Sequence, residues 1–286
     1  IIVLLVIVYS NYSSSFKVNL NEKNKNFENV KNDEVKIIFN GSNHDNISNS
    51  ELKESEQEDE TSRFYMLTKI DKKMESYVPP KYDDDISLEE FCIEFRKFSA
   101  GKLHLYYDIE DIRRFVASLA VTKLIILQGM SGTGKTSLAY AFGEFVDNEA
   151  VVIPIQPMWK ERTDLIGYYN EFTKKFNETE VLKELYVAGY TDDIYTVILD
   201  EMNISRVEYY FAEMLSILEM PNKDEWIVEL VSSSWPDDPK NIVDGKLKIP
   251  ANVWYIGTIN NDDSTFMVTD KVYDRAMPLD INDKGQ

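Results

Sequence analysis

Eight consecutive residues, Gly129 to Thr136, follow the pattern G-x-x-x-x-G-K-T, which is typical of loops that bind nucleotide phosphates. An apolar run, Leu124 to Leu127, leads into the loop, and a helix-compatible run, Ser137 to Val146, leads out of it. Glycines let successive backbone N–H groups turn toward one phosphate, and the start of a helix adds the positive end of its dipole. We therefore predict a phosphate-binding loop that consists of Gly129, Met130, Ser131, Gly132, Thr133, Gly134, Lys135, Thr136 and Ser137.

Two side chains of this loop carry chemistry of their own. The ammonium group of Lys135 is expected to reach the β- and γ-phosphates of a nucleoside triphosphate, and the hydroxyl of Thr136 can ligate Mg²⁺. A glycine-rich turn that binds nothing is the alternative, which the surrounding strand and helix patterns disfavour. The loop thus predicts ATP or GTP as the substrate and Mg²⁺ as the cofactor, and no base-reading motif chooses between the two nucleotides.

A second apolar run ends in two carboxylates, in the order Thr-Val-Ile-Leu-Asp-Glu, from Thr196 to Glu201. Asp200, at the carboxyl end of the expected strand, would hold Mg²⁺ directly or through water. Glu201 would accept a proton from the attacking water or orient that water. A surface strand capped by acids is the alternative, and it becomes the weaker one once the upstream loop is considered.

A third apolar run, Ile256 to Asn260, ends in a polar amide. If its strand lies beside the strand of the two acids, Asn260 comes close to the γ-phosphate and can hydrogen-bond the phosphate or the water. Without the other motifs this asparagine would be read as a turn residue.

Arg275 precedes the last short apolar run. A guanidinium group offers bidentate stabilisation to a developing phosphoryl anion, and supplied by a neighbouring subunit it would be an arginine finger. The alternative is an ion pair within the chain, to Asp274 or Asp270.

The elements that must position these side chains alternate from Leu124 onward, which predicts an α/β fold with a parallel sheet covered on both faces. The predicted strands are Leu124–Gln128, Val151–Ile155, Thr196–Leu199, Val253–Thr258 and Leu279–Ile281. Trp226–Val231 and Lys246–Ile249 read as a hairpin before the fourth strand. A helix with an apolar stripe from Val207 to Leu218 follows the third strand. Two more helices, one capped by Ser87 with the stripe Leu88, Phe91, Cys92, Phe95 and Phe98, and one starting near Asp108, should pack beside the nucleotide domain.

Composition bounds the possible functions. The chain has 286 residues, of which 43% are hydrophobic, so a sizeable core can form. A net charge of −19 argues against a broad basic surface for nucleic acid, although a local basic patch remains compatible with it. With one cysteine and two histidines, an internal disulfide is impossible and a zinc site is improbable.

Together these residues resemble the AAA+ superfamily, in the branch that contains McrB-type restriction motors, MoxR-like ATPases and dynein-related modules. The resemblance covers roughly residues 108 to 281, and its carriers are Gly129–Thr136, Leu199–Asn203, Gly257–Asn260 and Asp270–Arg275. It implies a P-loop NTPase core, a three-layer αβα sandwich around a parallel sheet. It further implies that Lys135 and Thr136 belong to Walker A, Asp200 and Glu201 to Walker B, Asn260 to sensor 1 and Arg275 to the finger position.

The chain also departs from the family pattern. Arg275 stands alone where the family often has consecutive arginines, and Arg206 is displaced from the position directly after Asn203. The sequence stops before the helical lid that usually follows the core. We expect three parts: an apolar start with an acidic, Asn-rich linker (1–63), a helical extension (64–122) and the AAA+ core (123–286).

The resemblance predicts an NTP-hydrolysing motor subunit that assembles into a hexameric ring. It also predicts a McrB-like role in restriction, with a nuclease subunit and DNA as partners. One alternative is a MoxR-like chaperone that remodels a protein client, and another is a nucleotide-gated scaffold with little turnover. The aromatic residues around Trp159, Tyr168 and Phe172 could grip a substrate in a ring or pack under a loop, and Arg162 and Arg206 could contact other subunits. A cytoplasmic location is expected, with a membrane tether if Ile1–Val8 is the end of a truncated membrane helix.

Overall fold

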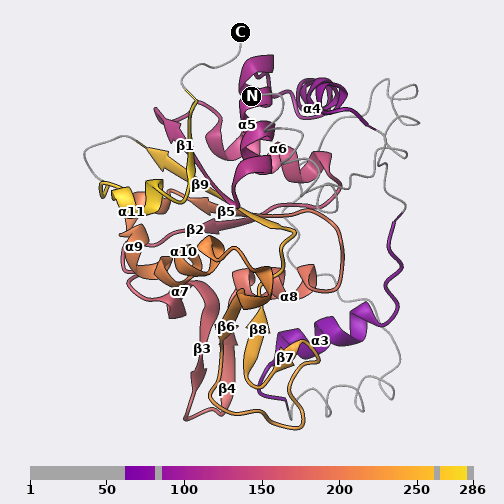
Figure 1. The fold of residues 1–286 in the computed structure, drawn as a ribbon, viewed down its shortest axis with the longest axis vertical. Coiled ribbons are helices and arrows are strands. Elements are labelled where there is room, and N and C mark those ends of the chain that lie inside the picture. The colour runs from indigo at the N-terminus through magenta and orange to yellow at the C-terminus, as the bar shows by residue number, and fades with distance from the viewer. Residues whose placement is uncertain (1–61, 81–85, 261–264, 282–286) are drawn as a thin grey trace, which may run out of the picture.

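The computed structural model describes residues 62–80, 86–260 and 265–281 of the chain, and its centre is a five-stranded parallel sheet (Figure 1). The strands lie in the order β10-β1-β9-β5-β2. Their bounds are Leu124–Gly129 for β1, Val151–Pro154 for β2, Tyr195–Asp200 for β5, Val253–Asn260 for β9 and Met277–Asp280 for β10. All five predicted strands are confirmed, with small shifts at their ends.

Side chains of β1 show why this strand is apolar at every core position. Leu124 and Ile126 belong to the hydrophobic cluster on one face of the sheet, whereas Ile125 and Leu127 belong to the cluster on the other face. A strand that is covered on both faces buries side chains of both orientations, so the alternation of apolar and polar residues is lost and the apolar run is nearly continuous.

One face of the sheet is covered by α4 (Leu88–Lys102), α5 (Ile109–Val121) and α6 (Lys135–Phe145). The Ser87 hydroxyl accepts the N–H of Glu90 at the start of α4, and the Asp108 carboxylate accepts the N–H of Glu110 at the start of α5. Both predicted helices are therefore confirmed. In the apolar stripe predicted for α4, Leu88 is the one residue that is not buried. It is 42% exposed, because it lies in the first turn, before the helix reaches the core.

On the other side of the sheet lie α7 (Arg162–Ile166), α8 (Glu180–Ala188), α9 (Val207–Tyr210), α10 (Ala212–Glu219) and α11 (Asp270–Tyr273). Helix α3 (Tyr65–Met74) packs farther out, against α8 and β4 (Figure 1). A 3₁₀ turn, η1 (Met202–Ile204), links β5 to α9, and a second, η2 (Lys223–Glu225), follows α10. The single helix expected from Val207 to Leu218 is two helices, because the backbone of Phe211 leaves the helical region (φ −108°, ψ 4°). The Phe211 ring meets Tyr255 of β9 edge-on at 5.4 Å, so its packing on the sheet accompanies the break.

Two small antiparallel sheets lie at the end of the molecule away from β1 and α6 (Figure 1). One consists of β3 (Gly167–Asn170) and β4 (Lys175–Glu178), and the other of β6 (Ile227–Glu229), β7 (Ile242–Val243) and β8 (Lys246–Lys248) in the order β6-β8-β7. Val228 pairs with Leu247, so the predicted hairpin before the fourth strand is confirmed.

Within the three described ranges, no helix combines the length and the apolar character that crossing a membrane requires. The apolar run Ile1–Val8 and the acidic linker up to residue 61 lie outside the described residues. The described chain begins at Ser62, and the side chain of Arg63 is already buried.

Candidate functional site

The order of the strands brings the predicted chemical residues to one edge of the sheet. Strand β9 lies between β1 and β5, with Gly129 opposite Asn260 and Leu199 opposite Gly257. Because the three strands are parallel, their carboxyl ends meet at the same edge. The glycine-rich loop after β1, the two acids at the end of β5 and the asparagine at the end of β9 are therefore neighbours.

The glycine-rich loop has a backbone that favours glycine at three of its positions. Gly129, Gly132 and Gly134 have φ values of 148°, 76° and 90°, which side-chain-bearing residues rarely adopt. A Cβ atom on Gly134 would lie 3.3 Å from the hydroxyl oxygen of Tyr107. That hydroxyl donates a hydrogen bond of 3.1 Å to the carbonyl of Gly134, so the tyrosine holds the loop where α6 begins. Burial raises the pKa of Tyr107, which keeps this donor protonated.

The Lys135 side chain folds back into the loop and is only 4% exposed. Its Nζ donates to the carbonyl oxygens of Met130 at 2.6 Å and Gly129 at 3.1 Å. Desolvation lowers the pKa of Lys135, and the charges of Asp200 and Glu201 partly oppose that shift. The ammonium group therefore lies within the loop, inside the field of the two acids.

Asp200 connects the loop to the centre of the sheet. Its Oδ1 accepts one hydrogen bond of 2.7 Å from the Thr136 hydroxyl and another of 2.8 Å from the Thr258 hydroxyl. The predicted pair of magnesium ligands, Thr136 and Asp200, is thus in direct contact.

Glu201 follows in the left-handed backbone region, with φ 52° and ψ 46°. Such a conformation is uncommon for a residue other than glycine, and it costs backbone energy that the surrounding structure must offset. The side chain of Glu201 is exposed, and its Oε1 accepts a hydrogen bond of 2.9 Å from Nδ2 of Asn260. Glu201 and Asn260, two of the three predicted catalytic residues, thus lie together at this edge.

The turn after Glu201 fits onto β9 at two further points. A Cβ atom on Gly257 would lie 2.0 Å from Sδ of Met202, so only glycine lets the chain pass this close. Asn203 is buried, and its Nδ2 donates to Thr265 Oγ1 at 2.9 Å and to the Asn260 carbonyl at 3.3 Å. Asn203 therefore ties the end of β9 to the segment that begins at Thr265.

Sequence reasoning gave no role to Tyr107, Thr258 or Asn203. The last two stand inside the Asp-Glu-Met-Asn and Gly-Thr-x-Asn motifs, so their place beside the chemical residues was a usable signal. Tyr107 carried no such signal, because it lies 27 residues before the glycine to which it bonds.

Arg275 is at the opposite edge of the sheet. Its backbone carbonyl accepts a hydrogen bond from Thr122, just before β1, and Met277 pairs with Ile125 near the amino end of that strand. The guanidinium group forms an ion pair of 2.7 Å with Glu219 and donates to the Lys271 carbonyl. The sequence suggested Asp270 or Asp274 as the partner, whereas the structure shows Glu219, at the end of α10. The structure does not bring Arg275 to the loop of its own chain.

The oxygen donors at this edge suit a magnesium ion. Mg²⁺ favours oxygen ligands and usually takes one or two from the protein, leaving the rest to phosphates and water. The Thr136 hydroxyl and the Asp200 carboxylate supply that number. Across the described residues no group of three or more His, Cys, Asp or Glu side chains is placed to hold a metal ion. Side chains at this edge could therefore supply only part of a metal's coordination.

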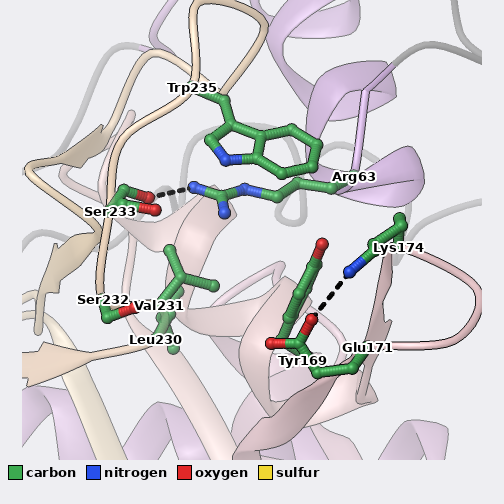
Figure 2. A pocket seen from close by; sticks show the side chains of 9 residues that line it. All are labelled: Arg63, Tyr169, Glu171, Lys174, Leu230, Val231, Ser232, Ser233 and Trp235. Carbon is green, nitrogen blue, oxygen red and sulfur yellow. Dashed lines mark hydrogen bonds and ion pairs between the residues drawn. The ribbon is translucent and has the colours of Figure 1, made fainter.

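A pocket of about 540 Å³ lies elsewhere, between β3, β4 and the segment after β6 (Figure 2). Arg63 crosses it beneath Trp235, with the guanidinium carbon 4.5 Å from the ring centroid. Its nitrogens bond both carboxylate oxygens of Asp238 at 2.7 Å, and Lys174 pairs with Glu171. Since its charged residues already satisfy one another, this pocket is a weaker candidate for chemistry than the edge of the sheet.

The aromatic residues expected near β3 behave differently from one another. Trp159 packs edge-on against Tyr210 with the ring centroids 5.5 Å apart, whereas Phe172 is 98% exposed and Tyr168 is half-exposed. Arg162 forms an ion pair with Glu213, and Arg206 lies over the ring of Phe266.

A scan against protein-family models found no match to this chain, and a search of curated proteins found no significant relative.

Proposed function

We propose that this chain binds a nucleoside triphosphate at the glycine-rich loop and hydrolyses it with Mg²⁺, as the AAA+ resemblance implies. The observation that carries the proposal is the hydrogen bond of 2.7 Å between Thr136 and Asp200. It joins the loop pattern and the acid pattern, found separately in the sequence, in one site with the oxygen chemistry that Mg²⁺ and phosphates require.

In this proposal the chain binds the substrate through the loop. The backbone N–H groups from Gly132 to Thr136, together with the start of α6, hold the phosphates, and Lys135 exchanges its carbonyl partners for phosphate oxygens. Thr136 and Asp200 would hold Mg²⁺, which when bound would neutralise charge on the phosphates.

The acid and the amide at the edge serve the reacting water. Water attacks the γ-phosphorus in line, the bond to the bridging oxygen of the diphosphate breaks, and the water proton passes to the carboxylate of Glu201. Asn260, which touches Glu201, hydrogen-bonds the same water or the γ-phosphate. Glu201 is exposed in the single chain, which fits a site that a neighbouring molecule closes.

Arg275 enters the proposal only through a second copy of the chain. Since it lies at the amino edge of its own sheet, it reaches a phosphate only at a neighbour's loop, as an arginine finger does in a ring. A hexameric ring and its partners, a nuclease with DNA or instead a protein client, stay predictions from the resemblance.

A binding experiment tests the first half of the proposal. Fluorescent ATP and GTP analogues are titrated with the parent chain, with Lys135→Ala and with Lys97→Ala, whose lysine is exposed on α4. We expect Lys135→Ala to weaken binding at least about tenfold, because it removes a charged phosphate contact, and Lys97→Ala to match the parent. Equal binding by all three proteins would contradict the assignment of the loop.

A further inference from the structure

Thr258 lies between the two acids without reaching the open edge itself. It follows Gly257, which pairs with Leu199, so its side chain stands beside the end of β5. Only 2% of the residue is exposed. Its hydroxyl bonds the two acids and not the open edge, so its contribution to the reaction passes through those neighbours.

The hydroxyl of Thr258 acts as both donor and acceptor toward those neighbours. It donates its one proton to Oδ1 of Asp200 at 2.8 Å, and its oxygen accepts the backbone N–H of Glu201 at 2.9 Å. The first bond fixes the rotation of the carboxylate that also receives the Thr136 hydroxyl. The second satisfies an N–H group in a backbone turn that is otherwise unfavourable for glutamate.

We infer that Thr258 is a positioning residue that sets the Asp200 carboxylate for Mg²⁺ and the Glu201 turn for the water, an inference that rests on the proposed function. This role explains why the Asp-Glu-Met-Asn and Gly-Thr-x-Asn motifs occur together in one chain. Gly257 makes room for Met202, Thr258 bonds Asp200 and Glu201, and the end of the strand at Asn260 bonds Glu201 and Asn203. The residues of one motif each have a partner in the other.

The chain offers a matched set of variants for this inference. Thr258→Val removes the hydroxyl and keeps the branched shape, whereas Thr258→Ser keeps the hydroxyl. Thr196→Val is the control, because Thr196 is also buried, lies on β5, and its hydroxyl has no hydrogen-bond partner among the described residues. The same Thr-to-Val change there removes no interaction from the site.

The experiment measures the Mg²⁺ concentration that gives half-maximal binding of a fluorescent ATP analogue, together with kcat. We expect Thr258→Val to raise that concentration and to lower kcat, each by about tenfold, because an acid and an N–H group lose their partner. Thr258→Ser should remain within about twofold of the parent, and Thr196→Val should be indistinguishable from it. A purely structural role would lower the unfolding midpoint without changing the Mg²⁺ requirement.

Parental values for Thr258→Val would overturn the inference while leaving the proposed function intact. Absence of Mg²⁺-dependent nucleotide binding by the parent chain would overturn both. If Thr258→Val does not fold, Thr258→Ser and Thr258→Ala replace it, since these two differ by one oxygen atom. Equal Mg²⁺ requirements for the Ser and Ala variants would then contradict the inference.

Discussion

The Nδ2 atom of Asn260 donates a hydrogen bond of 2.9 Å to Oε1 of Glu201, although 59 residues separate the two in the sequence. Both side chains end apolar strands that lie side by side in the sheet. A carboxylate that accepts this bond keeps its other lone pairs for a water molecule, so the pair is arranged as a proton acceptor beside a hydrogen-bond donor.

Glu201→Gln should separate binding from turnover. The amide oxygen of glutamine can still accept from Asn260, so nucleotide affinity should remain within about twofold of the parent. The hydrolysis rate should fall about 10²- to 10⁴-fold, because an amide cannot take the proton of water. Steady-state phosphate release and a binding titration on the same sample check this, and parental turnover by Glu201→Gln would remove the role assigned to this residue.

Arg275→Ala should lower the hydrolysis rate by at least about 10³-fold if the arginine acts on a neighbour's nucleotide. Mixing it with Glu201→Gln in equal amounts should recover activity, because some interfaces then combine an intact Glu201 with an intact Arg275. In a random ring about a quarter of the sites are of this kind. Arg113→Ala, at an exposed position of α5, serves as the control for charge removal. A mixture no more active than its two components would contradict action between subunits.

Much of this arrangement was readable in the sequence because its causes are local or periodic. The continuous apolar runs of β1, β5 and β9 predicted buried parallel strands, and Ser87 and Asp108 predicted two helix starts that the structure confirms. The partners of Thr258 and Asn203 were not readable, because they are set by the register of strands far apart in the chain. The ion pair of Arg275 with Glu219 was not predicted for the same reason, because the sequence indicates only acids that are close in the chain, such as Asp274, as partners.

The ion pair of Arg63 with Asp238 should contribute strongly to folding. Both side chains are buried, at 3% and 5% exposure, and the guanidinium group also donates to the Ser233 carbonyl. Asp238→Asn leaves a buried positive charge without its counter-ion and should cost about 3 kcal/mol of unfolding free energy. Glu75→Gln breaks an exposed pair with Lys240 and should leave the urea midpoint nearly unchanged. Similar midpoints for the two variants would show that burial of the Arg63 pair is unimportant.

Stability should fall as the pH rises toward neutrality, in part through Glu184. Burial, and secondarily the charge of Glu180, raises the pKa of Glu184 from 4.5 to about 7. Between these values the folded chain keeps a proton that the unfolded chain releases, so unfolding becomes easier as pH increases. Glu184→Gln should equal the parent below pH 4.5 and be more stable above pH 7, by at most about 3 kcal/mol.

Urea unfolding at several pH values measures this difference, with Glu229→Gln, at an exposed position of β6, as the control. A constant difference between Glu184→Gln and the parent across this range would contradict the assignment.

The most direct test of the proposed function is Mg²⁺-dependent phosphate release from ATP and from GTP, measured over a wide range of protein concentrations beside Glu201→Gln. We expect release from at least one nucleotide, with a specific activity that rises with concentration because Arg275 of a second copy completes each site. No release above the Glu201→Gln level, from either nucleotide at any concentration, would contradict the assignment of this chain as a nucleoside triphosphatase.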